Sequence, residues 1–314
     1  MDLEYMVWKQ KNFVSAVIYV YDTGNRIERF LKTLYGVLDE NFEKFEIICV
    51  NDASEDNSDE IIKKLARSFD NCMLNIVNMG YFQGVETAMN AGVDLAIGDF
   101  VFEFDSTVMD YDPSLIMQIY NRSLQGFDIV SCGKGSNNLS SKLFYSVFNR
   151  HSGTQYELKS ETFRVISRRA INRVHSMSVN LPYRKALYSN CGLKKDYIHY
   201  RSEISGANHR QTLKDPYDTA ITALILFTNI AYKITLIFTF LMMLATLGTV
   251  GYVVVVYLMG NPVAGYTTMM FLMSGAFFAL FAILAVVMKY LSVILGLIFS
   301  KQKYIVESVE KVTG

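Results

Sequence analysis

Between Ile234 and Met288 the sequence contains no Asp, Glu, Lys or Arg. This absence excludes an ordinary surface helix of a water-soluble domain, because such a helix keeps a polar face. A helix needs about 20 apolar residues to cross the hydrocarbon core of a bilayer, so the segment is long enough for two crossings. A Gly-Asn-Pro sequence at 260–262 interrupts it. We therefore expect two transmembrane helices within residues 234–299.

The sequence also lacks two common kinds of binding motif. It contains no Gly-x-x-x-x-Gly-Lys-Ser/Thr loop, so a phosphate-containing ligand must be bound by basic side chains or through a metal. The four cysteines have no metal-ligand spacing, and we expect them to be free thiols in the core. They are Cys49, Cys72, Cys132 and Cys191.

Most of the charged residues lie in residues 1–210, which we expect to form a globular domain ahead of the two helices. The first eleven residues are mixed polar and charged, unlike a signal peptide. Lysines flank the apolar segment on both sides, at positions 214, 233, 301 and 303. Because cytoplasmic flanks are rich in Lys and Arg, we expect both termini and the domain to be cytosolic. Residues 211–233 would then be an amphipathic juxtamembrane segment, and 300–314 a cytosolic tail.

Strand-like and helix-like patterns alternate along the first hundred residues. Short β-branched and aromatic runs predict strands at 13–21, 45–50, 73–77 and 99–104, and apolar periodicity predicts helices at 26–38, 59–68 and 84–96. This alternation predicts an α/β fold with a mostly parallel sheet and flanking helices.

Polar residues stand where these strands end. They are Tyr21, Asp22, Asn51, Asp52 and Asp105. Ligands of open α/β sheets bind beyond the carboxyl ends of the strands, so these side chains are the site candidates. Carboxylates at this position can accept hydrogen bonds from a base or a ribose, or hold a divalent metal that bridges a diphosphate.

Several motifs resemble one enzyme family. They are Val17–Asp22, Val50–Ser58, Asn78–Gly80, Asn90–Gly92 and Gly98–Asp105. In this order they are similar to the inverting family-2 glycosyltransferases, whose fold is the Rossmann-like GT-A fold. Two further motifs, Ser141–Gly153 and Phe163–Arg169, resemble the polyprenyl-phosphate branch that includes dolichyl-phosphate mannose synthases and bactoprenol glucosyltransferases. The resemblance covers nearly the whole chain, including the apolar segment.

The resemblance implies a role for each candidate. Tyr21 and Asp52 would hold the base of a UDP- or GDP-linked sugar, with Asp22 beside them. Asp105 and Arg164 would be catalytic, with Asp105 close to the ribose, the diphosphate and a Mg²⁺ or Mn²⁺ ion, and Arg164 near the phosphates. Four residues would face the phosphate of the lipid acceptor: Ser141, Lys142, Tyr145 and Arg201.

The sequence departs from the family pattern at the expected metal site. The second Asp of the Asp-x-Asp motif is Thr107, and a neutral hydroxyl is a poorer ligand for a hard cation than a carboxylate. Asp110 and Asp112 are the nearby acidic residues, but neither has the usual spacing. The motifs expected to bind the base match the family pattern more closely.

The leading hypothesis is a membrane-anchored inverting glycosyltransferase. It would move a sugar from a nucleotide donor to undecaprenyl or dolichyl phosphate at the cytosolic face of the plasma (inner) membrane. The alternative is a non-catalytic relative that acts as a nucleotide-binding membrane scaffold or partner subunit. Processive polysaccharide synthases share the fold but carry a Gln-x-x-Arg-Trp element, and the only tryptophan here is Trp8. We expect no nucleic-acid partner; glycines of the apolar segment permit a homo-oligomer.

Overall fold

The structure is a computed structural model. It describes residues 9–134, 145–146, 148–150, 156–176, 184–201 and 306–311, together with isolated residues between 237 and 294. The chain divides into two compact units. The first unit consists of Met1–Asn149, Thr154–Thr219 and Lys301–Gly314, and the second of Arg150–Gly153 and Ala220–Ser300.

An eight-stranded sheet forms the centre of the first unit, in the part of the chain that is described. Its order is β7-β5-β6-β4-β1-β2-β3-β8. The strands are β1 (Val14–Val20), β2 (Phe45–Asn51), β3 (Cys72–Met79), β4 (Phe100–Phe104), β5 (Ile129–Gly133), β6 (Phe163–Ser167), β7 (Lys195–His199) and β8 (Val306–Lys311). The neighbours from β4 through β1 and β2 to β3 are parallel, whereas β6 and β8 run antiparallel to their partners. The predicted mostly parallel α/β sheet is thereby confirmed.

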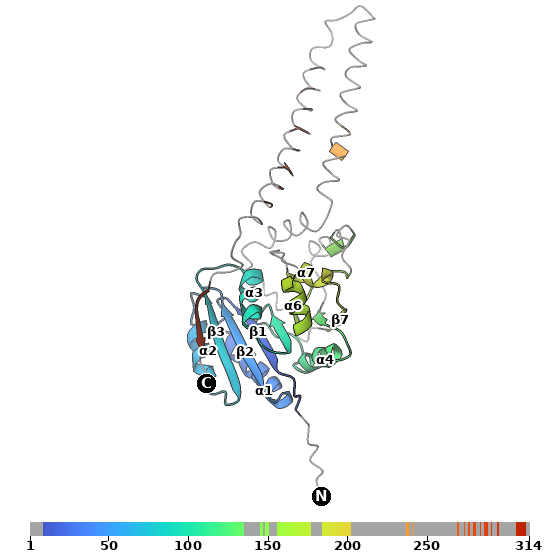
Figure 1. Cartoon of the computed structure of the whole chain (residues 1–314). Helices are drawn as coiled ribbons and strands as arrows, with labels where there is room; N and C mark the ends of the chain where they lie inside the picture. Colours follow the sequence, from blue (N-terminus) through green and yellow to red (C-terminus); the bar gives the residue numbers. More distant parts are fainter. Residues whose placement is uncertain are drawn as a thin grey trace, which may run out of the picture. The chain divides into compact units, whose positions relative to one another are not determined.

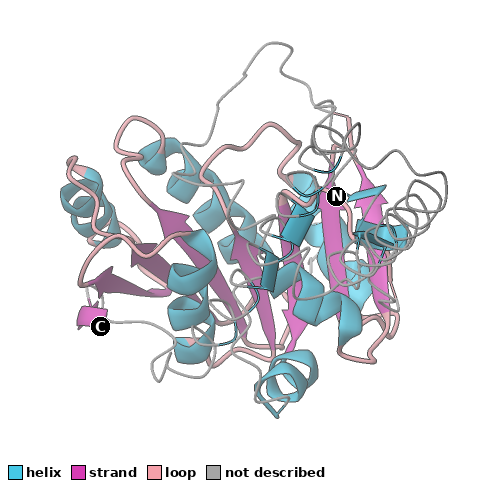
Figure 2. Ribbon diagram, turned by 90° about the horizontal axis from the view of Figure 1, so that it is seen from above, coloured by secondary structure: helices cyan, strands magenta, loops and turns pink. Residues whose placement is uncertain are grey.

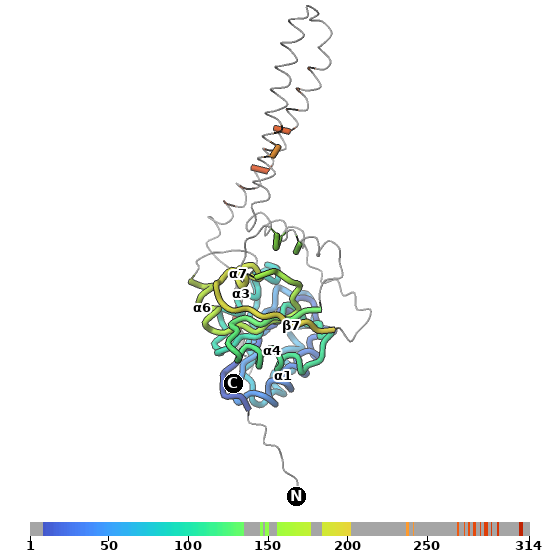
Figure 3. The backbone as a smooth tube through the Cα atoms, turned by 90° about the vertical axis from the view of Figure 1, so that its right-hand side faces the viewer, coloured from blue at the N-terminus to red at the C-terminus, as the bar shows by residue number. Residues whose placement is uncertain are grey.

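Helices cover both faces of this sheet (Figure 2). On one face lie α1 (Ile27–Asn41), α2 (Ser58–Ala66) and α4 (Ser114–Ser123), and on the other lie α3 (Val85–Leu95), α6 (Arg168–Ser176) and α7 (Arg184–Asn190). Figure 3 separates the two layers, with α3, α6 and α7 on one side of β7 and α1 and α4 on the other. Side chains alternate between the layers along a strand: Ile18 packs in the first core and Val17 in the second.

The seven elements predicted in the first hundred residues are all present, with ends that differ by a few residues at most. The eighth strand was not predicted, because residues 300–314 were expected to be a tail. Instead β8 pairs with β3 at the edge of the sheet, where Figure 1 shows it as the dark red arrow. Its sequence belongs to the same compact unit as the other strands.

The second unit is described only at isolated positions, which are helical. Several of them expose large apolar side chains: Ile237, Leu241, Met273, Leu280 and Ile294. Among the positions described, no helix has both the length and the hydropathy needed to cross a membrane. Most of the predicted spans within 234–299, and all of the juxtamembrane segment 211–233, lie outside the described residues.

Close contact between α3 and the sheet depends on Gly92, the last residue of the Asn90–Gly92 motif. A Cβ atom there would lie 2.4 Å from Cγ1 of Val17 and 2.6 Å from Cγ2 of Val50. Neither valine has room to move, because both are fully buried. The motif therefore serves helix–sheet packing at this position.

We expect Gly92→Ala to destabilise the protein by about 1–3 kcal/mol, the usual cost of overpacking a core. Gly36 is the matched control, since it lies within α1 and a Cβ atom there would meet nothing within 4 Å. Gly36→Ala should instead stabilise the helix by up to about 1 kcal/mol. Thermal unfolding of the purified full chain measures both changes, and equal shifts of the two midpoints would contradict the packing role.

Candidate functional site

The carboxyl ends of the parallel strands bring the candidate donor residues together. Tyr21 follows β1, and its ring contacts the ring of Phe82, which follows β3, with 4.7 Å between the centroids. Neighbouring Tyr81 is 56% exposed. This aromatic surface is suited to stacking a planar group such as a nucleobase. Sequence reasoning found Tyr21 but missed Phe82.

Asp52 organises this end of the sheet from a fully buried position. Its carboxylate accepts hydrogen bonds from the hydroxyl of Tyr19 at 2.9 Å and from the backbone N–H groups of Gln83 and Gly84, each at 2.8 Å. Burial raises the pKa of Asp52, although these three donors act in the opposite direction. The structure thus gives Asp52 a role that the sequence did not predict, which is to fix the loop that carries Phe82.

Asp22 lies beside Tyr21 in an unusual backbone conformation. Its φ is +48° and that of Ala53, in the facing turn, is +54°. Residues other than glycine seldom adopt this region, and the cost is of order 1–3 kcal/mol. Two of the hydrogen bonds that join the turns involve Asp22 itself. The N–H of Asp22 donates to Oγ of Ser54 at 3.2 Å, and the N–H of Glu55 donates to Oδ1 of Asp22 at 2.9 Å.

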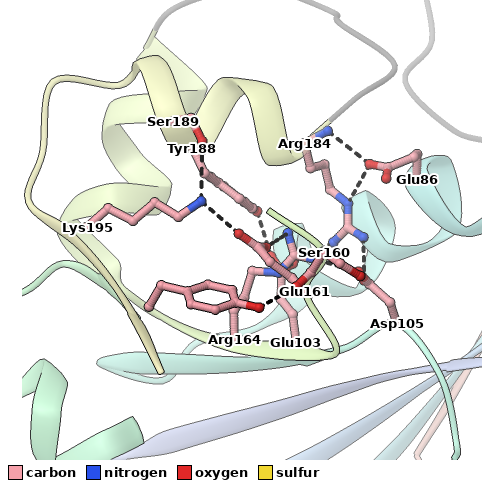
Figure 4. Close-up of polar contacts among 11 residues, drawn as sticks. Glu86, Glu103, Asp105, Ser160, Glu161, Arg164, Arg184, Tyr188, Ser189 and Lys195 are labelled. Carbon is pink, nitrogen blue, oxygen red and sulfur yellow. Dashed lines mark hydrogen bonds and ion pairs between the residues drawn. The ribbon is translucent and has the colours of Figure 1, made fainter. Parts of the chain in front are cut away.

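Asp105 lies at the end of β4 between two arginines (Figure 4). Nη2 of Arg184, from α7, donates to its Oδ1 at 2.7 Å, and Nη2 of Arg164, from β6, donates to its Oδ2. Both guanidinium groups are at most 1% exposed, whereas the Asp105 side chain is 15% exposed. The structure therefore brings together the two residues predicted as catalytic, and adds Arg184.

Further buried groups surround these three residues. Glu103 of β4 accepts hydrogen bonds from Arg184 and from the hydroxyl of Tyr188, each at 2.6 Å. Glu161 accepts a hydrogen bond from Nζ of Lys195 at 2.7 Å. Nε and Nη1 of Arg164 lie 3.4 Å from Glu103 and Glu161 and form no hydrogen bond. Unlike an isolated buried charge, every ionised group here has an opposite charge in contact.

The charges in this network keep one another ionised. Burial opposes ionisation of Asp105, but Arg164 and Arg184 overcome it and hold the pKa of the carboxyl well below its usual range. Burial likewise opposes the charge of Glu161, yet Lys195 and Arg164 lower its pKa to about 2. For Arg164, the neighbouring carboxylates outweigh burial and raise the pKa.

This donor set does not fit the divalent cation that the family resemblance implies. Both oxygens of Asp105 already accept hydrogen bonds from guanidinium groups, and the hydroxyl of Thr107 is buried. Asp110 binds Lys134 and Tyr200 instead, and Asp112 binds the N–H of Ser114. Within the described ranges, no three His, Cys, Asp or Glu side chains are grouped as a metal site. A hard cation prefers several free oxygen ligands, which these residues do not supply.

The predicted acceptor residues are only partly described. Ser141 and Lys142 lie outside the described residues. Tyr145 is half-buried in a helical turn, and Arg201 is exposed just beyond β7.

Sequence reasoning did not select four residues of this network as site residues: Arg184, Glu103, Glu161 and Lys195. For Glu103 a signal was present, since it is the one charged residue in the apolar run Phe-Val-Phe-Glu-Phe of β4. It lies directly opposite Arg164 in the pairing of β4 with β6. A charge within each of two buried strands indicates a buried ion pair, because an isolated one would be too costly.

We expect Asp105→Asn to destabilise the protein by about 3–5 kcal/mol, because it leaves two buried guanidinium groups with one carboxylate fewer. The measurement is the thermal unfolding midpoint of the full chain. Asp112→Asn is the matched control, since Asp112 is exposed and asparagine can also accept the hydrogen bond from Ser114. A midpoint for Asp105→Asn equal to that of the control would contradict the network.

The lowered pKa of Glu161 predicts a pH-dependent stability. Its ordinary pKa is 4.5 and its pKa in the folded protein is about 2. The stabilisation is therefore complete above pH 4.5 and is lost as the pH falls toward 2. The difference in unfolding midpoint between the wild type and Glu161→Gln should be largest near pH 7 and shrink below pH 4.5. A difference that is constant from pH 7 to pH 3 would rule out this linkage.

Comparison with known proteins places the chain in a family. It is 28% identical over 198 residues to an uncharacterized glycosyltransferase of Synechocystis, covering 60% of this chain and 61% of that protein. It is 25% identical to the bactoprenol glucosyl transferase of Shigella phage SfX, covering 82% of this chain and 86% of that protein. Among solved structures, it is similar to glucosyl-3-phosphoglycerate synthase from Mycobacterium tuberculosis in complex with Mn²⁺, UDP and glucosyl-3-phosphoglycerate. That match has 13% identity and a TM-score of 0.47, covering 69% of this chain and 80% of the other.

The family model covers nearly all of β1, the strands β2 to β6, the aromatic pair and the ion network apart from Lys195. The model of glycosyl transferase family 2 matches residues 15–190, which is more than half of the 314-residue chain. The chain belongs to glycosyl transferase family 2.

Proposed function

We propose that this protein is a membrane-anchored inverting glycosyltransferase that moves a sugar from a UDP- or GDP-linked donor to a polyprenyl phosphate, either undecaprenyl or dolichyl. The observation that carries the proposal is the similarity to the phage bactoprenol glucosyl transferase. It covers 82% of this chain, so it must extend beyond the family domain into the charge-free segment. The catalytic domain and both termini would lie on the cytosolic side of the plasma (inner) membrane, and self-association through the anchor is part of the proposal.

The arrangement of the site supports a single displacement. The oxygen of the acceptor phosphate is already ionised at neutral pH, so it can attack the anomeric carbon without a strong general base. The bond from that carbon to the nucleoside diphosphate breaks, and its electron pair leaves with the diphosphate oxygen. Positive charge near this oxygen stabilises the departing group. Arg164 and Arg184 are the buried cations at the carboxyl end of β4, and Asp105 holds both in place.

One end of the site is proposed to bind the base of the donor, and the other its diphosphate. Tyr21 and Phe82 offer a stacking surface for the base, and Asp22 follows Tyr21 directly in the sequence. Ser141, Lys142, Tyr145 and Arg201 remain the proposed contacts of the acceptor phosphate. Mg²⁺ or Mn²⁺ is implied by the family alone, and no step of the proposed reaction passes through it.

One observation favours a second candidate function. Both oxygens of Asp105 are bound by the protein itself, as they would be in a relative that binds a nucleotide but no longer transfers sugar. Such a protein would act as a nucleotide-binding membrane scaffold or partner subunit.

Transfer of radiolabelled sugar decides between the two. We expect membranes containing the full chain to label undecaprenyl or dolichyl phosphate from at least one donor in a panel of UDP- and GDP-sugars. Asp105→Ala should lower the rate at least about 100-fold, because it releases the cations that stabilise the leaving group. Asp112→Asn is the control and should keep the wild-type rate. If no donor labels the lipid, with or without Mg²⁺ or Mn²⁺, the transferase proposal fails and the scaffold is the better description.

A further inference from the structure

Side chains as well as backbone connect strand β8 to the carboxyl ends of the parallel strands, where the nucleotide sugar is proposed to bind. Ser308, in the middle of β8, is half-buried, and its Oγ accepts a hydrogen bond from Nδ2 of Asn78 on β3 at 3.1 Å. Oδ1 of Asn78 in turn accepts a hydrogen bond from Nδ2 of Asn51 on β2, also at 3.1 Å. Ser308 and Asn78 are 230 positions apart in the sequence.

The same series of hydrogen bonds continues into the turn that follows β2. Oδ1 of Asn51 accepts from the N–H of Ser54 at 3.1 Å, and Oγ of Ser54 accepts from the N–H of Asp22 at 3.2 Å. We call these five residues, Ser308, Asn78, Asn51, Ser54 and Asp22, the strand-end relay. It runs from the edge strand β8 to the turn after β1, and all of its members described here belong to the first compact unit.

The three inner members, Asn78, Asn51 and Ser54, each donate toward β8 and accept from the side of Asp22, the two asparagines through one carboxamide and Ser54 through its backbone N–H and its Oγ. Hydrogen bonds aligned in this way polarise and strengthen one another. The two central positions require a side chain that donates and accepts at once, which a carboxamide does and a carboxylate does not. Asn51 and Asn78 meet this requirement, so the residue types agree with the geometry.

The turn at the end of the relay is the part of the site that needs support. Asp22 and Ala53 both have positive φ, a conformation that persists only where surrounding contacts hold it. The turn also lies directly beside Tyr21, which contributes half of the aromatic pair. A substitution of Ser308 can therefore alter the position of the aromatic pair, although Ser308 itself does not contact the ligand.

We propose that Ser308 and Asn78 are positioning residues, through which β8 fixes the turns that bind the donor nucleotide. That these turns bind the nucleotide rests on the proposed function. The coupling between β8 and the turns is independent of the proposed function. Neither residue touches the donor in this proposal; each acts through Asn51 and Ser54.

Hydrogen exchange tests the coupling by itself, in the full chain without ligand. Ser308→Ala removes the last acceptor of the relay, and the amides of Ser54 and Glu55 should then exchange about three to ten times faster, as expected for loss of one neutral hydrogen bond. Ser308→Thr keeps the hydroxyl and should restore the wild-type rates. Val309→Ala is the matched control, since Val309 is the next residue of β8 and is 52% exposed. Wild-type exchange in Ser308→Ala, or equal acceleration in Val309→Ala, would overturn the proposal.

Steady-state transfer kinetics test the consequence for the donor. In Ser308→Ala the KM for the nucleotide sugar should rise about three- to tenfold, with kcat unchanged and with wild-type values in Ser308→Thr. An unchanged KM beside accelerated exchange would overturn the donor-positioning role. If the wild type transfers no sugar, the proposed function fails, and the exchange rates still decide whether the relay exists.

Discussion

The fold of the described domain depends on the contact between Asp105 and two arginines. Arg164 lies inside the sheet, on a strand between β5 and β4, with no exposed surface. A guanidinium group can be buried there only because carboxylates from β4 and from the residues just before β6 meet it. Removing one partner of such a pair costs about 3–5 kcal/mol, which is a large part of the stability of an ordinary domain. The same few charged side chains therefore hold β4 beside β6 and fix the position of α7.

This dependence links stability to the proposed chemistry. The groups that would stabilise a leaving diphosphate are already held in fixed positions by Glu103, Asp105 and Glu161, so little reorganisation would be needed during a reaction. At the expected metal position, the buried hydroxyl of Thr107 adds no charge to this network.

Much of the fold could be predicted from the sequence, because local patterns encode it. The buried strands are short apolar runs, and their polar ends identify Tyr21, Asp22 and Asp105 as site candidates. Arg184 could not be found in this way, since its importance comes from contacts with Glu86, Glu103 and Asp105, which are far from it in sequence. Asp52 was found for its position, but two of its three protein donors, Gln83 and Gly84, become visible only when the β3–α3 loop is placed. Strand β8 was missed because its pairing partner lies more than two hundred positions earlier.

The late position of β8 has a consequence for how the protein is made. The other strands of the sheet precede the charge-free segment, whereas β8 follows it. During synthesis the outer edge of β3 therefore stays unpaired until the whole apolar segment has been translated. An open edge is a template for pairing with other chains, so the nascent domain is exposed to misassembly during this interval. Completion of the sheet therefore waits until translation has passed the charge-free segment.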